Sequence, residues 1–250
     1  MITLLSRLFI KRPTDYEDSA VRIAYGALCG AAGIFFNLLL FTGKLLAGSL
    51  SGSIAITADA FNNLSDAGSS LVSLVGFRLS GHQADNEHPF GHGRIEYVAG
   101  LIVSMAILLV GVELIKSSVE KILSPEPMAF SWWAAAVLIG SMLVKLYMYL
   151  YNRDVGKRIG SAAMMAAARD SLSDVAATGV VLLCTFVSKW TNLTVDGYAG
   201  ALVALFILYS GVMAAKETIS PLLGEPPTRE YVEHIQRLVL AHPEVVRVHD

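Results

Sequence analysis

Six long apolar segments dominate the sequence, and each is close to the length that a helix needs to cross a lipid bilayer. A membrane-spanning helix requires about 20 predominantly apolar residues. The segments cover residues 21–47, 53–79, 95–121, 131–152, 160–187 and 194–217. Hydrophobic residues make up 54% of the chain and charged residues only 16%, which is far from the balance of a soluble domain. We therefore expect an all-α, multi-pass membrane protein with six transmembrane helices.

The connections between the segments predict the orientation of the chain. Short turns alternate with two longer polar connections, from Arg78 to Arg94 and from Asn152 to Gly160. Only Lys121 and Lys189 fall on one side, whereas the other side carries most of the basic residues: Arg7, Lys11, Arg12, Arg22, Arg78, Arg94, Arg153, Lys157 and Arg158. The positive-inside rule then places both termini in the cytoplasm, and we expect an integral protein of a bacterial inner (plasma) membrane.

The character of the chain changes after the sixth segment. The stretch "GEPPT" breaks the helix, "REYVEHIQRLVLA" has helical spacing, and "EVVRV" has the pattern of a strand. We expect a cytoplasmic N-terminal segment at 1–20, a six-helix domain at 21–220, and the start of an α+β cytoplasmic domain at 221–250. One helix and one strand cannot bury a core alone, so we expect this last unit to be incomplete.

A polar octet, "DAFNNLSD" at residues 59–66, interrupts the second apolar segment. Asn62 and Asp66 are four residues apart and share a helix face. The fifth segment repeats this spacing in "ARDSLSD", where Asp170 and Asp174 are also four apart. The helical rise places both pairs about 15 to 20 Å into the membrane, near its midplane. Two helices therefore present pairs of oxygen ligands at similar depth.

Carboxylates at the centre of a bilayer need compensating charge. Each costs at least about 2.5 to 3.5 kcal/mol on insertion scales, and a divalent cation would compensate Asp66, Asp170 and Asp174 together. The alternative is hydrogen bonding across the bundle or pairing with Arg169, but one arginine cannot satisfy three carboxylates. Asp59 and Asn63 lie on other parts of the helix, so we expect them to support the ligands indirectly or to pack.

Four stretches together resemble the cation diffusion facilitator family: "GSIAITADAFNNLSDAGSS", "HPFGHGRIEYVAG", "AARDSLSDVAATGV" and "DGYAGALVALFILYSG". The resemblance covers nearly the whole chain. It implies a homodimer of six-helix protomers, each of which exports a divalent metal from the cytoplasm in exchange for protons. It also implies a ferredoxin-like cytoplasmic C-terminal domain, whose first helix and strand match residues 228–250.

The ligand set differs from that of the zinc-transporting members, which use histidine together with aspartate. Here the implied transport site is Asn62, Asp66, Asp170 and Asp174, all oxygen ligands. Carboxylate and amide oxygens suit manganese and magnesium, whereas imidazole suits zinc. Similar all-oxygen sites in the family are associated with manganese, so Mn²⁺ is the expected substrate, with Zn²⁺, Fe²⁺ and Mg²⁺ as alternatives. We expect no prosthetic group.

The resemblance implies two further metal sites. In related transporters, the residues that match Asp85, His88 and His92 bind a metal in the loop before the third segment; alternatively, these residues shape the turn. At the C-terminus, His249 and Asp250 resemble part of a regulatory site whose other ligands would follow residue 250. The alternative there is a set of surface histidines.

Transport by alternating access around the midplane site is the expected mechanism. Once the metal leaves, repulsion among the carboxylates favours the uptake of protons in its place.

A membrane-embedded, metal-dependent hydrolase is the competing class, because paired acids can also activate water. The sequence offers neither a His-Glu zinc motif nor a glycine-flanked nucleophile, so we expect no enzyme. A passive channel would need several chains around one pore. The net charge of -2 gives no reason to expect nucleic acid as a partner.

Overall fold

A computed structural model of the 250-residue chain describes residues 19–79, 95–124, 131–191, 195–224, 229–242 and 245. The described part forms seven helices. They are α2 (Ser19–Ser51), α3 (Ile54–Leu79), α4 (Ile95–Leu123), α5 (Trp132–Ile159), α6 (Ala162–Thr191), α7 (Asp196–Leu223) and α8 (Arg229–Leu240). The first six of these helices, α2 to α7, follow the six predicted apolar segments in order, and all are α-helical as predicted.

Five of these helices are long and apolar enough to cross a membrane: α2, α4, α5, α6 and α7. α3 is 26 residues long but carries the polar octet, and it is not among these five. Large apolar side chains such as Leu109, Leu143, Leu183 and Leu202 are exposed on the outer faces of the bundle. In water such faces would be unfavourable, and in lipid they are the expected surface. The chain is therefore an integral membrane protein.

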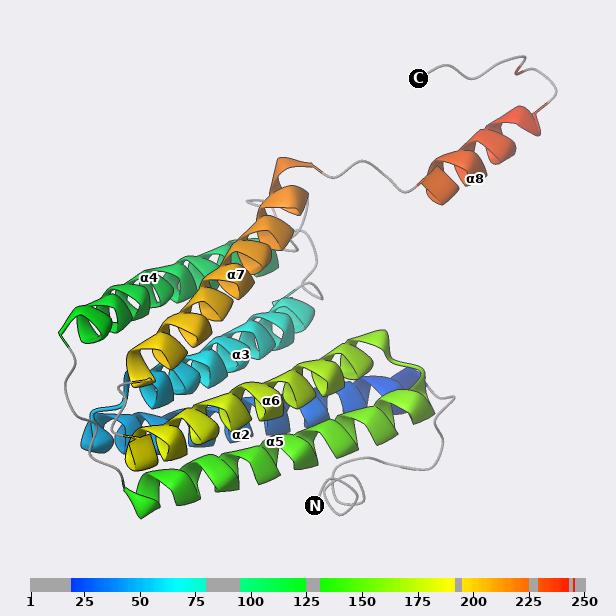
Figure 1. The fold of residues 1–250 in the computed structure, drawn as a ribbon. Helices are drawn as coiled ribbons and strands as arrows, with labels where there is room; N and C mark the ends of the chain where they lie inside the picture. Colours follow the sequence, from blue (N-terminus) through cyan, green and yellow to red (C-terminus); the bar gives the residue numbers. More distant parts are fainter. Residues whose placement is uncertain are drawn as a thin grey trace.

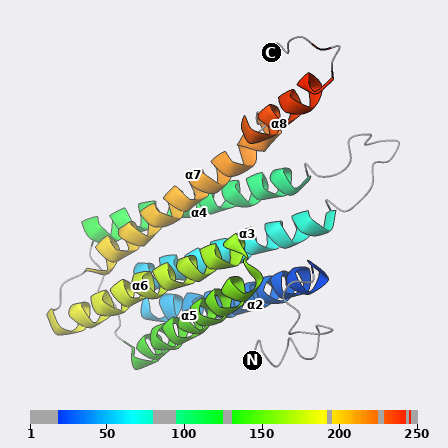
Figure 2. The same cartoon turned by 90° about the vertical axis from the view of Figure 1, so that its right-hand side faces the viewer.

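The helices form two groups that meet at α3. α2, α3, α5 and α6 lie side by side, and α4 and α7 pair closely with each other on the other side of α3 (Figures 1 and 2). α3 packs against helices of both groups, so it is the most central helix. α8 contains no buried residue and lies apart from the bundle (Figure 1).

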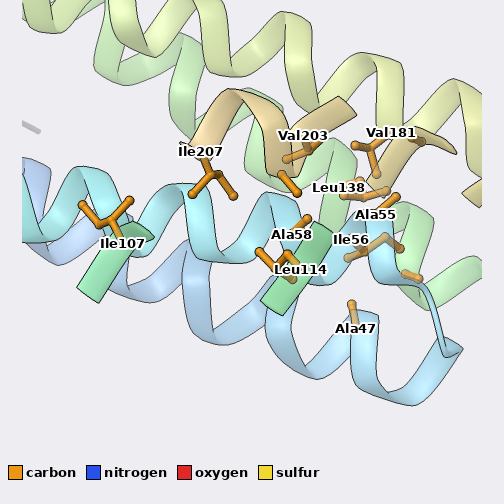
Figure 3. Close-up of a cluster of buried hydrophobic side chains, with 13 residues drawn as sticks. Ala47, Ala55, Ile56, Ala58, Ile107, Leu114, Leu138, Val181, Val203 and Ile207 are labelled. Carbon is orange, nitrogen blue, oxygen red and sulfur yellow. The ribbon is translucent and has the colours of Figure 1, made fainter. Parts of the chain in front are cut away.

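Two clusters of buried apolar side chains hold the bundle together, one toward each end. The first includes Ile56, Leu138, Val181 and Ile207, which come from α3, α5, α6 and α7 (Figure 3). The second joins the start of α2 to the end of α5 and the start of α6, through residues that include Tyr25, Met148, Tyr151, Ile159 and Met164. We call the two ends the Gly52 end and the Gly160 end, after the glycines in their turns. Both glycines have the positive φ that favours glycine, +66° and +63°.

A buried ion pair within the α4–α7 group contacts the start of α3 at the Gly52 end. Asp196, the first residue of α7, lies 2.8 Å from the ammonium of Lys121, at the end of α4. The same carboxylate accepts hydrogen bonds from the Ser53 hydroxyl at 2.5 Å and from the backbone N–H of Ile54 at 2.9 Å. Lys121 also donates to the carbonyl of Gly52. The start of α3 is thus fastened to the α4–α7 pair.

One predicted connection is wrong. Residues 152–159, expected to be a polar connection, form the last two turns of α5, and the turn to α6 is confined to Gly160 and Ser161. The helix continues because this stretch is amphipathic: Asn152, Val155 and Ile159 face inward while the charged residues face outward. The other helices differ from their predicted bounds mainly by extending past the apolar stretch, as membrane helices commonly do.

The predicted α+β unit is represented in the described residues by α8 alone. They contain no strand, and apart from Val245 the stretch "EVVRV" lies outside them. The predicted N-terminal segment falls outside the described residues except for its last two positions.

Candidate metal site

The candidate site lies near the middle of the bundle, between the two apolar clusters. On α5, Lys145 follows Leu138 of the first cluster and precedes Met148 of the second. On α6, Asp174 lies between Met164 and Val181 in the same way. Lys145 is 13 residues from the start of α5, which places its backbone about 20 Å along the helix. The site is therefore far from both ends.

Helical periodicity explains why Asp174 points into the bundle. The buried residues of α6 recur every three or four positions: Met164, Ala168, Ser171, Asp174, Thr178, Val181 and Thr185. Such a stripe faces the neighbouring helices in a bundle. Asp174 occupies a position on this stripe that otherwise holds small or apolar residues, and 5% of its surface is exposed. The fold thus forces the carboxylate into the interior, where it needs partners.

Three of the four predicted transport-site residues come together. Asn62 and Asp66 lie one turn apart on α3, and both face α6 or α5. The Asn62 side-chain amide donates a hydrogen bond to Asp174 Oδ1 at 2.8 Å. Asp66 and Asp174 are joined indirectly, because both contact the same ammonium group.

Asp170, the fourth predicted residue, lies one turn from Asp174 toward the Gly160 end and is exposed. It stands beside the buried stripe of α6 rather than on it. Within the ranges that the structure describes, no three acidic, histidine or cysteine side chains converge closely enough to hold a metal ion by themselves. The four-residue ligand set therefore stays a prediction.

The shared ammonium belongs to Lys145 of α5. Its Nζ lies 2.8 Å from Asp66 Oδ2 and 2.5 Å from Asp174 Oδ2. The lysine is 1% exposed, and the side chains of Asp66 and Asp174 are 32% and 7% exposed. Positive charge from the chain itself thus compensates two of the carboxylates.

A second buried lysine compensates Asp59 in the same manner. Lys44 of α2 is fully buried, and its Nζ lies 2.8 Å from Asp59 Oδ2. Thr178 of α6 accepts a hydrogen bond from Lys44 at 3.0 Å and contacts both oxygens of Asp59, at 3.0 and 3.2 Å. The neighbouring Asn63 is also fully buried and donates to the backbone carbonyl of Asp59 at 3.0 Å. These residues form a polar layer next to the candidate site, toward the Gly52 end.

Sequence reasoning missed both lysines. It considered Arg169 as the countercharge, but Arg169 is exposed on α6. The signal was present in "FTGKLLAG" and "SMLVKLYM", where a single lysine stands inside an apolar run. A lone charge in such a run is costly unless it faces the interior and finds a partner.

The remaining predicted site residues lie outside the described residues. These are Asp85, His88 and His92 of the loop, and His249 and Asp250 of the tail.

Chemically, the described cluster offers carboxylate oxygens, an amide and an ammonium group. Oxygen ligands of this kind suit hard divalent cations. Ion binding at this cluster stays a prediction.

Comparison with known proteins identifies the family of the chain. Residues 31–223 match the cation efflux transmembrane domain family. An uncharacterized transporter of Methanocaldococcus jannaschii is 30% identical over 214 residues, which cover 86% of this chain and 76% of the relative. The cation-efflux pump FieF of Escherichia coli K12 is 30% identical over 231 residues, covering 91% of this chain and 77% of the pump.

The manganese efflux system protein MneS of Bacillus subtilis is 39% identical over 140 residues. That alignment covers 55% of this chain and 47% of MneS. The family match spans most of the chain, and the pumps among these relatives move cations rather than catalyse a reaction. The chain therefore belongs to the cation diffusion facilitator family and is a cation efflux transporter, not an enzyme.

Proposed function

We propose that this transporter exports Mn²⁺ from the cytoplasm in exchange for protons. The observation that carries the proposal is the buried cluster of Asn62, Asp66 and Asp174, which offers oxygen ligands and no imidazole. Carboxylate and amide oxygens are the ligand type that suits Mn²⁺, whereas imidazole suits Zn²⁺. Zn²⁺ binds most oxygen sites more tightly, so selectivity for Mn²⁺ rests on coordination geometry and metal supply. Similarity to a manganese efflux protein supports the same choice of metal.

Charge balance supports a divalent substrate. In our proposal Asp170 joins Asp66 and Asp174 when the metal binds. The three carboxylates then carry a formal charge of minus three, of which a dication cancels two and a monovalent cation only one. A low-dielectric site strongly favours the larger compensation. Zn²⁺, Fe²⁺ and Mg²⁺ carry the same charge and are the alternative substrates.

Protons replace the metal in the second half of the proposed cycle. When the dication leaves, two or more carboxylates remain close together in a desolvated site, and proton uptake relieves their repulsion. The site then alternates between the two sides of the membrane. We further propose that α3 also crosses the membrane, which brings the number of spans from five to six. We propose as well that protomers pair as homodimers and that residues 221–250 begin a ferredoxin-like cytoplasmic domain.

The proposed orientation places the Gly160 end and both termini in the cytoplasm of a bacterial plasma membrane. Arg153, Lys157 and Arg158 lie at that end of α5, in agreement with the positive-inside rule. Trp132, Trp133 and Trp190 are exposed at the Gly52 end, as expected of a membrane interface.

The test is metal flux into proteoliposomes that contain the purified protein. We expect Mn²⁺ uptake that saturates with concentration and that stops when the imposed pH gradient is abolished. Competition by Zn²⁺, Fe²⁺ and Mg²⁺ in the same vesicles ranks the substrates. Flux that rises linearly with Mn²⁺ and ignores the pH gradient would contradict an exchanger and indicate a passive channel.

A further inference from the structure

Lys145 stands where a metal would have to bind. Its ammonium lies between Oδ2 of Asp66 and Oδ2 of Asp174, at 2.8 and 2.5 Å. The lysine is 1% exposed and the Asp174 side chain 7%, so water screens the Lys145–Asp174 pair little, whereas the Asp66 side chain is 32% exposed. Nothing in the alternating-access scheme requires a fixed positive charge at this place.

Metal and ammonium cannot share this position. A divalent ion binds carboxylate oxygens at about 2.0 to 2.6 Å, so it would occupy the same space between the two carboxylates as the ammonium, which lies 2.8 and 2.5 Å from them. Asp174 is already committed on both oxygens, since Oδ1 accepts from Asn62 and Oδ2 from Lys145. A dication that binds Asp66 and Asp174 together must therefore displace Lys145 Nζ from between them.

We propose that Lys145 is a built-in competitor of the transported metal, an inference that rests on the proposed function of this site. Its ammonium holds the two carboxylates while no dication is bound, and its flexible four-carbon stem lets it withdraw when one arrives. It returns as the metal departs, which prevents the site from retaining its substrate. Lys145 thus sets the affinity of the site for every dication rather than selecting one of them.

The size of the effect follows from the population of the competing state. If Lys145 occupies the site in about nine molecules of ten, the apparent affinity for the metal is about tenfold weaker than the intrinsic affinity. Removing the ammonium removes this penalty. A structural role would give the opposite sign, because loss of a buried partner leaves Asp66 and Asp174 unpaired and weakens the fold.

Lys44 provides a matched control. It is equally buried, and it also pairs with an aspartate of α3 and a side chain of α6. However, Lys44 pairs with Asp59 and not with Asp66 or Asp174. Replacing Lys44 therefore removes a buried ammonium of the same kind without vacating the position between the two carboxylates.

The experiment measures the Kd of Mn²⁺ for the full chain in detergent, using the electron paramagnetic resonance signal of free Mn²⁺. All proteins carry His88→Ala and His92→Ala, so that the loop contributes no binding. We expect Lys145→Met and Lys145→Gln to bind Mn²⁺ about tenfold more tightly than the parent. Lys44→Met should bind with the parental Kd. Mg²⁺ competition should show the same gain in Lys145→Met, because a shared competitor affects all dications alike.

A parental or weaker Kd in both Lys145 variants would overturn the proposal. Lys145→Gln keeps a polar side chain of similar length, so it tests the idea even if Lys145→Met fails to fold. Asp174→Ala separates this inference from the proposed function. If Asp174→Ala loses Mn²⁺ binding but the Lys145 variants gain none, the competitor idea alone fails. If Asp174→Ala binds Mn²⁺ like the parent, the assignment of the site itself fails.

Discussion

At the scale of single residues, buried lysines compensate the acids of α3. The Lys145 ammonium lies between Asp66 and Asp174 and offsets their negative charge. The Lys44 ammonium offsets the charge of Asp59. Burying an ion pair is roughly neutral for stability, but removing one partner is costly. In our proposal the Lys145 pairs serve a purpose other than stability, because they hold the charged site ready for exchange.

Asp170 is the position at which the family resemblance implies the clearest departure from zinc-transporting members. Asp170→His would add an imidazole nitrogen, which suits four-coordinate Zn²⁺, and remove one negative charge. We expect the ratio of Mn²⁺ to Zn²⁺ transport to fall by roughly tenfold, equivalent to about 1.4 kcal/mol of differential binding. The measurement is competitive uptake of both ions into vesicles under one fixed pH gradient. A level or rising ratio would mean that oxygen ligation does not select the substrate.

The loop histidines allow an independent residue-scale prediction. If Asp85, His88 and His92 hold a metal, the double variant His88→Ala and His92→Ala should lose one equivalent of bound metal per protomer. The midplane equivalent should remain, because these residues lie far along the chain from Asn62 and Asp174. Equilibrium dialysis followed by elemental analysis counts the equivalents, and His242→Ala serves as a control for loss of an ordinary histidine. Unchanged stoichiometry would favour a turn-shaping role.

The site was only partly predictable from the sequence. Asn62, Asp66 and Asp174 could be found because polar residues four apart in an apolar run are rare and share a helix face. The exposure of Asp170 could not be predicted, since it depends on how α6 rotates against α3 and α5. The partner of each acid could not be predicted either, because Lys44 and Lys145 lie on helices whose neighbours are fixed only by the tertiary fold.

At the scale of elements, the Lys121–Asp196 pair fastens α3 to α4 and α7. Asp196→Asn keeps the shape of the side chain but leaves Lys121 buried without its counterion. We expect a loss of about 3 to 5 kcal/mol in the free energy of unfolding, the usual cost of breaking a buried pair. Unfolding followed by circular dichroism in mixed detergent micelles measures this loss.

The matched control is Glu113→Gln, on the exposed pair with Lys116 at 3.9 Å. Exposed pairs contribute little to stability, so this variant should unfold like the parent. The Mn²⁺ affinity of Asp196→Asn should also stay at the parental value, because the pair lies at the Gly52 end, away from Asp66 and Asp174. Equal stability of the two variants would show that the pair does not fasten these helices.

The helices themselves were largely predictable, because lipid imposes a length and an apolar composition on each span. Their ends were less so. α5 extends to Ile159 because the residues after Asn152 alternate inward and outward at helical spacing, a pattern hidden among charged residues. The hydrogen bond between Ser53 of the α3 start and Asp196 of α7 joins residues 143 positions apart, and no local sequence pattern predicts such a contact.

At the scale of the whole molecule, the arrangement suggests how the site could be exposed alternately to the two sides. The candidate site lies among α3, α5 and α6, whereas α4 and α7 form a separate pair (Figure 2). The two groups meet along α3 and are joined at the Gly52 end through Asp196. In the proposed alternating-access cycle, motion of one group against the other opens or closes the Gly160 end while this junction holds.

The most direct test of the account is Mn²⁺ uptake by Asp174→Ala in proteoliposomes under an imposed pH gradient. Asp174 contacts both Asn62 and Lys145, so its loss removes the centre of the site. Asn62→Ala should retain part of the flux, because water can replace a neutral ligand. Asp154→Ala removes an exposed carboxylate of α5 and should transport like the parent. We predict that Asp174→Ala reduces uptake to the level of protein-free vesicles while the protein stays folded. Parental uptake by a folded Asp174→Ala protein would contradict the claim that the metal passes through this site.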